Sequence, residues 1–150
     1  MNPFHTALAE LQATTDALDL SAVAAASALI ADAGRIVAYG CGREGLQLRG
    51  FVMRLYHLGL RASMQGDMTT PALGPGDLLI CSAGPGELAT VTALMRVAQT
   101  AGADVLFLTA EPKTGAAVLA TQVLHIPAQT MASDRAGAAD KPGQSALPMG

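Results

Sequence analysis

Aromatic and charged side chains are scarce in this sequence of 150 residues. It has no Trp, two Tyr and three Phe, and only 14% of its residues are charged, whereas 51% are hydrophobic. The core must therefore be aliphatic and closely packed, and the chain is long enough to bury it in one domain. Two cysteines, Cys41 and Cys81, are too few for a disulfide scaffold. We therefore expect a reduced, cytoplasmic protein.

Clusters of basic residues are also missing. The formal net charge is −3 and the nine Lys and Arg are scattered, which argues against a nucleic-acid partner. No apolar run approaches the roughly 20 residues of a membrane span, and no basic segment precedes an apolar stretch at the N-terminus, as it does in a signal peptide. We expect neither nucleic acid nor a membrane as partner.

Short apolar runs alternate with longer helix-like segments along the chain. Strands are predicted at 35–39, 61–64, 78–81, 104–108 and 122–126, and helices at 3–32, 45–58, 87–100 and 114–120. Strands that alternate with helices pair in parallel through right-handed crossovers. The pattern predicts an α/β fold, a doubly wound three-layer sandwich with about five parallel strands.

The pattern also divides the chain into three segments. Residues 1–32 are predicted to form a helical segment that packs on the domain, and residues 33–128 to form the α/β domain itself. Residues 129–150 are rich in Ala, Gly and Pro and lack periodicity, which predicts an irregular C-terminal loop or tail.

Two glycine-rich turns follow predicted strands. The first reads YGCGREG and includes Gly40 and Gly42, and the second reads CSAGPGE and includes Gly84 and Gly86. Ligands of doubly wound sheets bind beyond the carboxyl ends of the strands, where the strand order reverses. Glycines let the backbone approach a ligand, and a following helix offers free N–H groups. We expect a phosphate or a sugar ring there.

A dinucleotide is the alternative ligand of the first turn. Gly40, Gly42 and Gly45 have the G-x-G-x-x-G spacing, but Asp67 comes two or three residues too late for the acidic residue that binds the ribose. A lone glycine fingerprint is weak evidence for a nicotinamide cofactor.

Three blocks carry a resemblance to a known family: GRIVAYGCGREG, FVMRLYHLGLRA and TPALGPGDLLICSAGPGE. With AGADVLFLTAEPKTGAAVLATQVLHIPA they resemble the sugar isomerase (SIS) domain superfamily, and within it 6-phospho-3-hexuloisomerase. The resemblance implies a five-stranded parallel sheet, a homodimer or homotetramer with sites near subunit interfaces, and a phosphosugar substrate. It also implies interconversion of 3-hexulose 6-phosphate and fructose 6-phosphate without metal or other cofactor.

The turns depart from that family pattern. Glu44 stands where the family's first turn, Gly-x-Gly-Arg-Ser-Gly, has Ser, and Ala83, Pro85 and Leu88 replace the hydroxyl residues of the second, Ser-Gly-Ser-Gly-Glu-Thr. Pro85 also lacks an N–H donor. A carboxylate about 4 Å from a phosphate costs roughly 4 kcal/mol per unit of like charge at an effective dielectric near 20. Phosphosugar binding is therefore expected to be weakened, redirected to an unphosphorylated or cationic ligand, or lost.

Catalysis of such an isomerisation needs a base that lifts a proton from carbon and returns it through an enediol. The resemblance makes Glu87 and His57 the candidates. The alternative for Glu87 is a carboxylate in the first turn of a helix, favoured by the dipole. The alternative for His57 is a residue near a helix C-terminus, packed against Tyr56.

Substrate-binding candidates surround the turns. Arg43 is the best anchor for an anion, although a solvent-facing ion pair with Glu44 is the alternative. Ser82 is a possible hydroxyl donor, and Thr69 and Thr70 lie in a loop that can reach the pocket in this fold. Two thiols make a poor metal site, so no metal is expected.

Two function classes stay open. Family members continue into a C-terminal helix with an acidic residue implicated in proton transfer, and these 150 residues do not contain it. We expect a sugar-phosphate isomerase, and a non-catalytic sugar-derivative-binding or regulatory domain with a degenerate phosphate site is the alternative.

Overall fold

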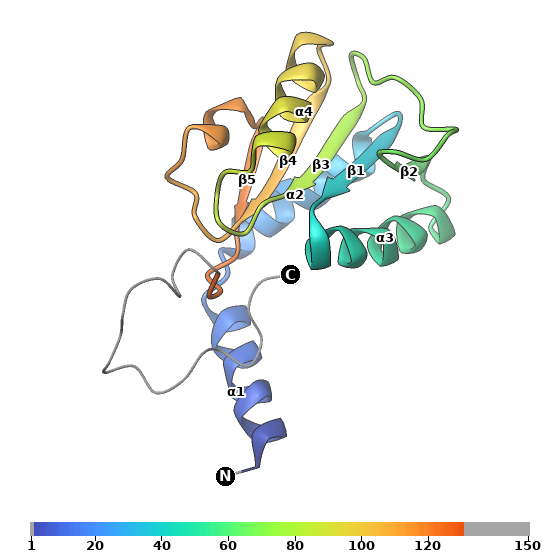
Figure 1. Ribbon diagram of the computed structural model, residues 1–150. Coiled ribbons are helices and arrows are strands. Elements are labelled where there is room, and N and C mark those ends of the chain that lie inside the picture. Colours follow the sequence, from blue (N-terminus) through green and yellow to red (C-terminus); the bar gives the residue numbers. More distant parts are fainter. Residues whose placement is uncertain (1, 131–150) are drawn as a thin grey trace.

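The central layer is a parallel sheet of five strands in the order β2-β1-β3-β4-β5, as the computed structural model of residues 2–130 shows (Figure 1). The strands are β1 (Ile36–Gly40), β2 (Ala62–Met64), β3 (Leu78–Ser82), β4 (Asp104–Thr109) and β5 (Gln122–His125). The strand order reverses between β1 and β3, and a ligand crevice is expected at such a switch point. The predicted α/β sandwich is confirmed.

Helices cover both faces of this sheet. Helices α2 (Leu20–Asp32) and α3 (Gly42–His57) pack on one face, and α4 (Ala89–Thr100) and the 3-10 helix η1 (Ala116–Leu119) pack on the other. The three layers predicted from the alternation of strands and helices are therefore present.

Alternate residues of β3 build the two halves of the core. Leu78 and Ile80 pack with apolar residues of α3, whereas Leu79 and Cys81 pack with apolar residues of α4. Every residue of β3 is buried because helices cover both sides of it. The core is aliphatic, as the composition predicts, with Phe107 as its largest fully buried side chain.

The N-terminal segment differs from the single helix predicted over 3–32. Helix α1 (Pro3–Asp16) ends before α2 begins, and the two meet at 81°. Asp19 starts α2 as its N-cap, since its side chain accepts hydrogen bonds from the backbone N–H groups of Ser21 and Ala22. Because Asp is a common N-cap residue, Asp19 was the sequence feature that could have predicted this break.

The two N-terminal helices also differ in packing. Ala26 of α2 is buried in the core, but α1 has no buried residue and projects from the layers in Figure 1. Helix α2 thus contributes to the core, whereas no residue of α1 is buried. The predicted tail, 129–150, lies outside the described residues except for Gln129 and Thr130.

No single helix within residues 2–130 has both the length and the apolar character of a membrane span. Only α1 and α2 counted together across their bend reach that length and hydropathy.

An ion pair fixes the edge of the sheet at which β1 and β3 begin. Arg35 Nη2 lies 2.6 Å from Asp77 Oδ2, and Arg35 Nε donates to both carboxylate oxygens at 3.1 Å. The backbone N–H of Gly74 also donates to Asp77 Oδ2, at 2.9 Å. These contacts align the starts of two adjacent strands and thereby their carboxyl ends, where the glycine turns follow.

Candidate functional site

The first glycine turn joins β1 to α3 with very little space. A Cβ on Gly45 would lie 2.4 Å from the carbonyl oxygen of Gly40, so only glycine fits at this crossing of strand and helix. Gly42 has a φ of +53°, in the left-handed region that favours glycine. The glycines predicted to approach a ligand are thus first of all required by the backbone geometry.

The second glycine turn is fastened to the neighbouring strand. Ala83 N–H donates to the carbonyl of Leu108 at 3.0 Å, and Ala110 N–H donates to the carbonyl of Gly84 at 3.2 Å. Gly86 has a φ of +87°, and its carbonyl accepts a hydrogen bond from Thr114 Oγ1 at 2.8 Å. Backbone bonds therefore hold the turn in place without a ligand.

The two turns lie side by side at the carboxyl edge of the sheet. Gly40 of β1 pairs with Ser82 of β3, so the turns leave adjacent strands at the same level. Glu44, in the first turn of α3, bridges them: its carboxylate accepts hydrogen bonds from Ser82 Oγ and from Gly84 N–H, the latter at 2.9 and 3.0 Å. The hydrogen-bond donors of the second turn thus bind an anionic group, the carboxylate of Glu44.

This arrangement of Glu44 corrects the sequence-based alternatives. Among residues 2–130, no hydrogen bond or ion pair joins Arg43 to Glu44, and Arg43 is exposed. Leu88, which stands where the family pattern has a hydroxyl residue, packs against the core. The family resemblance implied that Glu44 stands in place of a serine, but not that its side chain reaches the turn after the neighbouring strand β3. One feature of the sequence could have indicated this contact. Hydroxyl residues are missing from the second turn, while the first turn has gained a carboxylate, Glu44, that can accept hydrogen bonds.

Further donors are exposed at the starts of both helices. Cys41 precedes α3 and Leu88 precedes α4, and neither side chain caps its helix. The first N–H groups of a helix lack partners within the helix and favour negative charge. The edge formed by the two turns can therefore bind an anion or the hydroxyls of a sugar.

Glu87 lies at the second turn with its side chain exposed. Its two carboxylate oxygens would lie 4.0 Å from a Cβ built on Gly115, which places them against the loop before η1. Helix α4 begins at Ala89 rather than near 87, and no acidic residue occupies its first turn. The alternative role of Glu87, a carboxylate in the first turn of a helix, is therefore wrong, because the helix starts later than its apolar pattern suggested.

His57 is not brought to these turns within one chain. It is the last residue of α3, whereas Gly42 is the first, and a helix of 16 residues is roughly 22 Å long. Its ring packs near that of Tyr56, with centroids 6.3 Å apart. The predicted catalytic pair of Glu87 and His57 is thus separated by the length of the helix.

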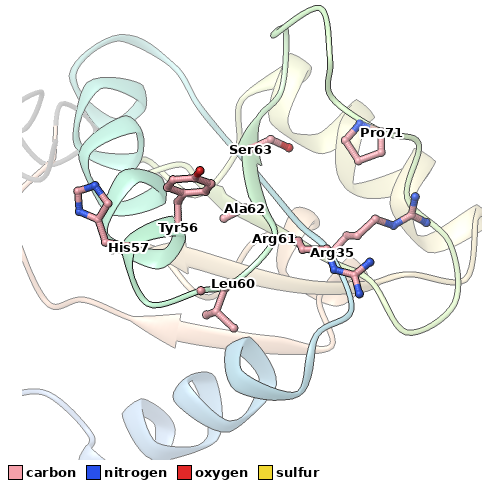
Figure 2. A pocket seen from close by; sticks show the side chains of 9 residues that line it. Arg35, Tyr56, His57, Leu60, Arg61, Ala62, Ser63 and Pro71 are labelled. Atoms are coloured by element: carbon pink, nitrogen blue, oxygen red, sulfur yellow. The ribbon is translucent and has the colours of Figure 1, made fainter.

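His57 instead lines a cleft of about 660 Å³ beside the edge strand β2 (Figure 2). Figure 2 shows His57 and Tyr56 on the helix side of this cleft and Arg35 and Arg61 across from them. The two arginines belong to the starts of β1 and β2, so most of this cleft is remote from the glycine turns.

Thr69 and Thr70 lie in the loop that leaves the carboxyl end of β2. Thr69 is exposed, and the hydroxyl of Thr70 donates to the carbonyl of Met64. The loop starts at the same edge as the glycine turns, but the Thr70 hydroxyl is engaged in closing the loop.

The two cysteines differ in environment. Both are free thiols, and burial raises the pKa of the Cys81 thiol to about 12. Cys81 is therefore a buried apolar residue rather than a nucleophile. Within residues 2–130, no three His, Cys, Asp or Glu side chains are grouped so that they could hold a metal ion.

Comparison with known proteins adds to this geometry. No family model matches the chain. The 3-hexulose-6-phosphate isomerase of Mycobacterium gastri is 40% identical over 119 residues, which cover 79% of this chain and 60% of that protein.

Two solved structures share the fold. A hypothetical protein of Methanococcus jannaschii, whose crystal structure is described as inferring a 3-hexulose-6-phosphate isomerase function, is 27% identical with a TM-score of 0.67, over 71% of this chain and 59% of that one. The Vibrio vulnificus NanR protein complexed with ManNAc-6P is 24% identical with a TM-score of 0.71, over 81% of this chain and 48% of that one. The chain spans less than two thirds of the length of each of these three proteins.

Proposed function

Since the chain belongs to the sugar isomerase (SIS) superfamily, we propose that it carries the phosphosugar site of a sugar-phosphate isomerase of the 3-hexulose-6-phosphate type. One observation carries the proposal. Two glycine turns meet at the switch point of the sheet, and their donors, Ser82 Oγ and Gly84 N–H, already bind a carboxylate. Groups that bind one oxyanion can bind another of similar size and charge.

The proposed binding residues have distinct tasks. Ser82 and Gly84 donate to the oxygens of the substrate, and Arg43, exposed in the first turn of α3 next to Glu44, attracts its negative charge. Gly42, where an added Cβ would meet nothing within 4 Å, leaves the approach to the first turn open, whereas Gly40 and Gly86 allow the turns to pack closely on their neighbours. Thr69 and Thr70 border the substrate from the loop after β2.

Glu87 is the proposed base, and no cofactor is required. Moving the carbonyl between C3 and C2 of the hexulose requires that a proton leave C2 as an enediol forms and that a proton be added at C3. The exposed carboxylate of Glu87 accepts the first proton, exchanges it with solvent, and then donates a proton to the neighbouring carbon. The relatives' names and the position of Glu87 at the second turn support this role.

We also propose that the protein is a cytoplasmic homodimer or homotetramer. Large apolar side chains are exposed on α1 and α3, among them Phe4, Leu8, Leu46 and Met53. His57, remote from the turns of its own chain, can act on a substrate only across such an interface. Light scattering of the purified protein tests the assembly, and a monomer at micromolar concentration contradicts it.

Deuterium incorporation tests the isomerase. With fructose 6-phosphate in D₂O, an active enzyme places deuterium at C3, as observed by NMR. Glu87→Gln is expected to lower this rate by about 100-fold, within the range that a general base contributes. Arg96→Gln, an exposed change on α4, serves as the control. Binding of the sugar phosphate without deuterium at C3 favours the non-catalytic binding domain instead.

A further inference from the structure

The carboxylate of Glu44 uses the donors that the proposed substrate needs. Ser82 is 4% exposed and Gly84 is buried, so their donor groups are held in a fixed frame. The single hydrogen of the Gly84 N–H is shared between both oxygens of Glu44, and the Ser82 hydroxyl donates to one of them. No donor of this pair is left for a second anion.

The same carboxylate is held without a cation. Within residues 2–130, neither ion pair involves Glu44: one joins Arg35 to Asp77, the other Arg49 to Asp67. Among the described residues, Glu44 is stabilised by the neutral donors Ser82 and Gly84 and by its place in the first turn of α3. Its side chain is half-buried and the neighbouring Gly42 and Arg43 are exposed, so it can rotate towards solvent without a change of backbone.

We infer that Glu44 is an internal competitor of the substrate's phosphate group, and that it sets how strongly the site binds phosphosugars. The inference rests on the proposed function, since it assigns the phosphate to Ser82 and Gly84. A phosphate reaches these donors only when the Glu44 side chain leaves them, because two anions repel each other and the donors are saturated. Glu44 is therefore a specificity-determining residue, which weakens phosphate binding relative to a site with a small hydroxyl residue at this position.

Three variants test this role. Glu44→Ser removes the carboxylate and offers a hydroxyl, and Glu44→Gln keeps the shape and an acceptor but removes the charge. Asp32→Ser, an exposed change at the end of α2, alters the net charge equally and is the control. Dissociation constants for inorganic phosphate and for fructose 6-phosphate are measured by calorimetry, and the Gly84 amide is followed by NMR during each titration.

The expected result is a graded one. Glu44→Ser binds both probes about tenfold more tightly or better, which is the factor that one hydrogen bond to a charged group can supply. Glu44→Gln lies between Glu44→Ser and the unaltered protein, and Asp32→Ser differs from the latter by less than about twofold, as expected for a remote screened charge. The Gly84 amide resonance shifts on phosphate addition in Glu44→Ser far below the concentration that the unaltered protein needs.

Other outcomes overturn the inference. Equal affinity of the unaltered protein and both folded variants shows that Glu44 does not compete, even if the deuterium assay reports turnover. Phosphate binding that leaves the Gly84 amide unmoved in every variant places the phosphate elsewhere. The proposed function fails separately: tight binding by Glu44→Ser without deuterium at C3 in any variant supports the competitor and contradicts the isomerase. If Glu44→Ser does not fold, Glu44→Gln alone decides, because it retains acceptors for Ser82 and Gly84.

Discussion

Two carboxylates connect the β1 and β3 regions, one at each edge of the sheet, and they are held differently. Asp77, where the strands begin, is buried and binds the guanidinium of Arg35 as well as Gly74 N–H. Glu44, where they end, binds the neutral donors Ser82 and Gly84 and pairs with no cation in the part of the chain that the structure describes. A paired carboxylate fixes the fold, whereas a carboxylate on neutral donors can give way to a ligand of the same charge.

The titration behaviour of Asp77 agrees with its structural role. The hydrogen bond from Arg35 lowers the pKa of Asp77 below its ordinary value, although burial acts in the opposite direction. The charged form is therefore the stable one in the folded protein, and neutralising it removes stability.

The largest expected effect concerns the backbone contact at the carboxyl edge. Gly45→Ala is expected to lower the free energy of unfolding by about 3 kcal/mol, because the added Cβ would lie 2.4 Å from the Gly40 carbonyl oxygen. Urea denaturation followed by circular dichroism measures the loss.

A matched glycine of the same helix is the control for this effect. Gly50 is exposed, and an added Cβ would meet nothing within 4 Å. Gly50→Ala is therefore expected to stabilise the protein by about 0.5–1 kcal/mol through helix propensity. If both variants lose stability equally, the crossing of β1 and α3 is not the cause.

The second largest effect is expected for Asp77, at the edge of the sheet where β1 and β3 begin. Asp77→Ala is expected to cost about 2 kcal/mol, since it removes the carboxylate that binds Arg35 and Gly74, and the half-exposed Arg35 regains water. Asp67→Ala breaks the exposed pair with Arg49, whose atoms are 3.8 Å apart, and should cost less than about 0.5 kcal/mol. Equal losses in thermal unfolding would remove the distinction between the two pairs.

The contribution of Asp77 to the free energy of unfolding should decrease at acid pH. Because the pKa of Asp77 is lowered on folding, its contribution is fully present above the unfolded value near 3.8 and is lost as the pH falls through the folded value. The stability difference between the unaltered protein and Asp77→Asn should therefore be largest at pH 7 and shrink below about pH 4. Urea titrations at pH 7, 4 and 3 measure it; a difference that stays constant contradicts the assignment.

A smaller effect on stability than that of Asp77→Ala is expected at the other carboxylate, Glu44. Glu44→Ala should cost less than about 1 kcal/mol, because water can enter the space left by the half-buried carboxylate and accept the hydrogen bonds of Ser82 and Gly84. A loss as large as that of Asp77→Ala would make Glu44 a structural residue and would end the contrast between the two edges.

Much of the fold was predictable from local patterns. The apolar runs 35–39, 78–81 and 104–108 lie within one residue of the ends of β1, β3 and β4, since buried parallel strands are continuously apolar. The break between α1 and α2 was missed because no Gly or Pro interrupts the sequence from Phe4 to Ala33, so that only the cap at Asp19 marks the boundary. The roles of Glu87, Arg43 and the two threonines in binding or catalysis stay predictions.

The sequence by itself determined the alternation of strands and helices and the two glycine turns, because these follow from the period of apolar residues and from the φ values that glycine allows. Only the tertiary structure decided that Glu44 reaches Gly84, forty residues away, and that His57 does not reach the turns. Both are consequences of how the elements are placed in space: β1 and β3 are neighbours in the sheet, and α3 is too long for its two ends to share a site.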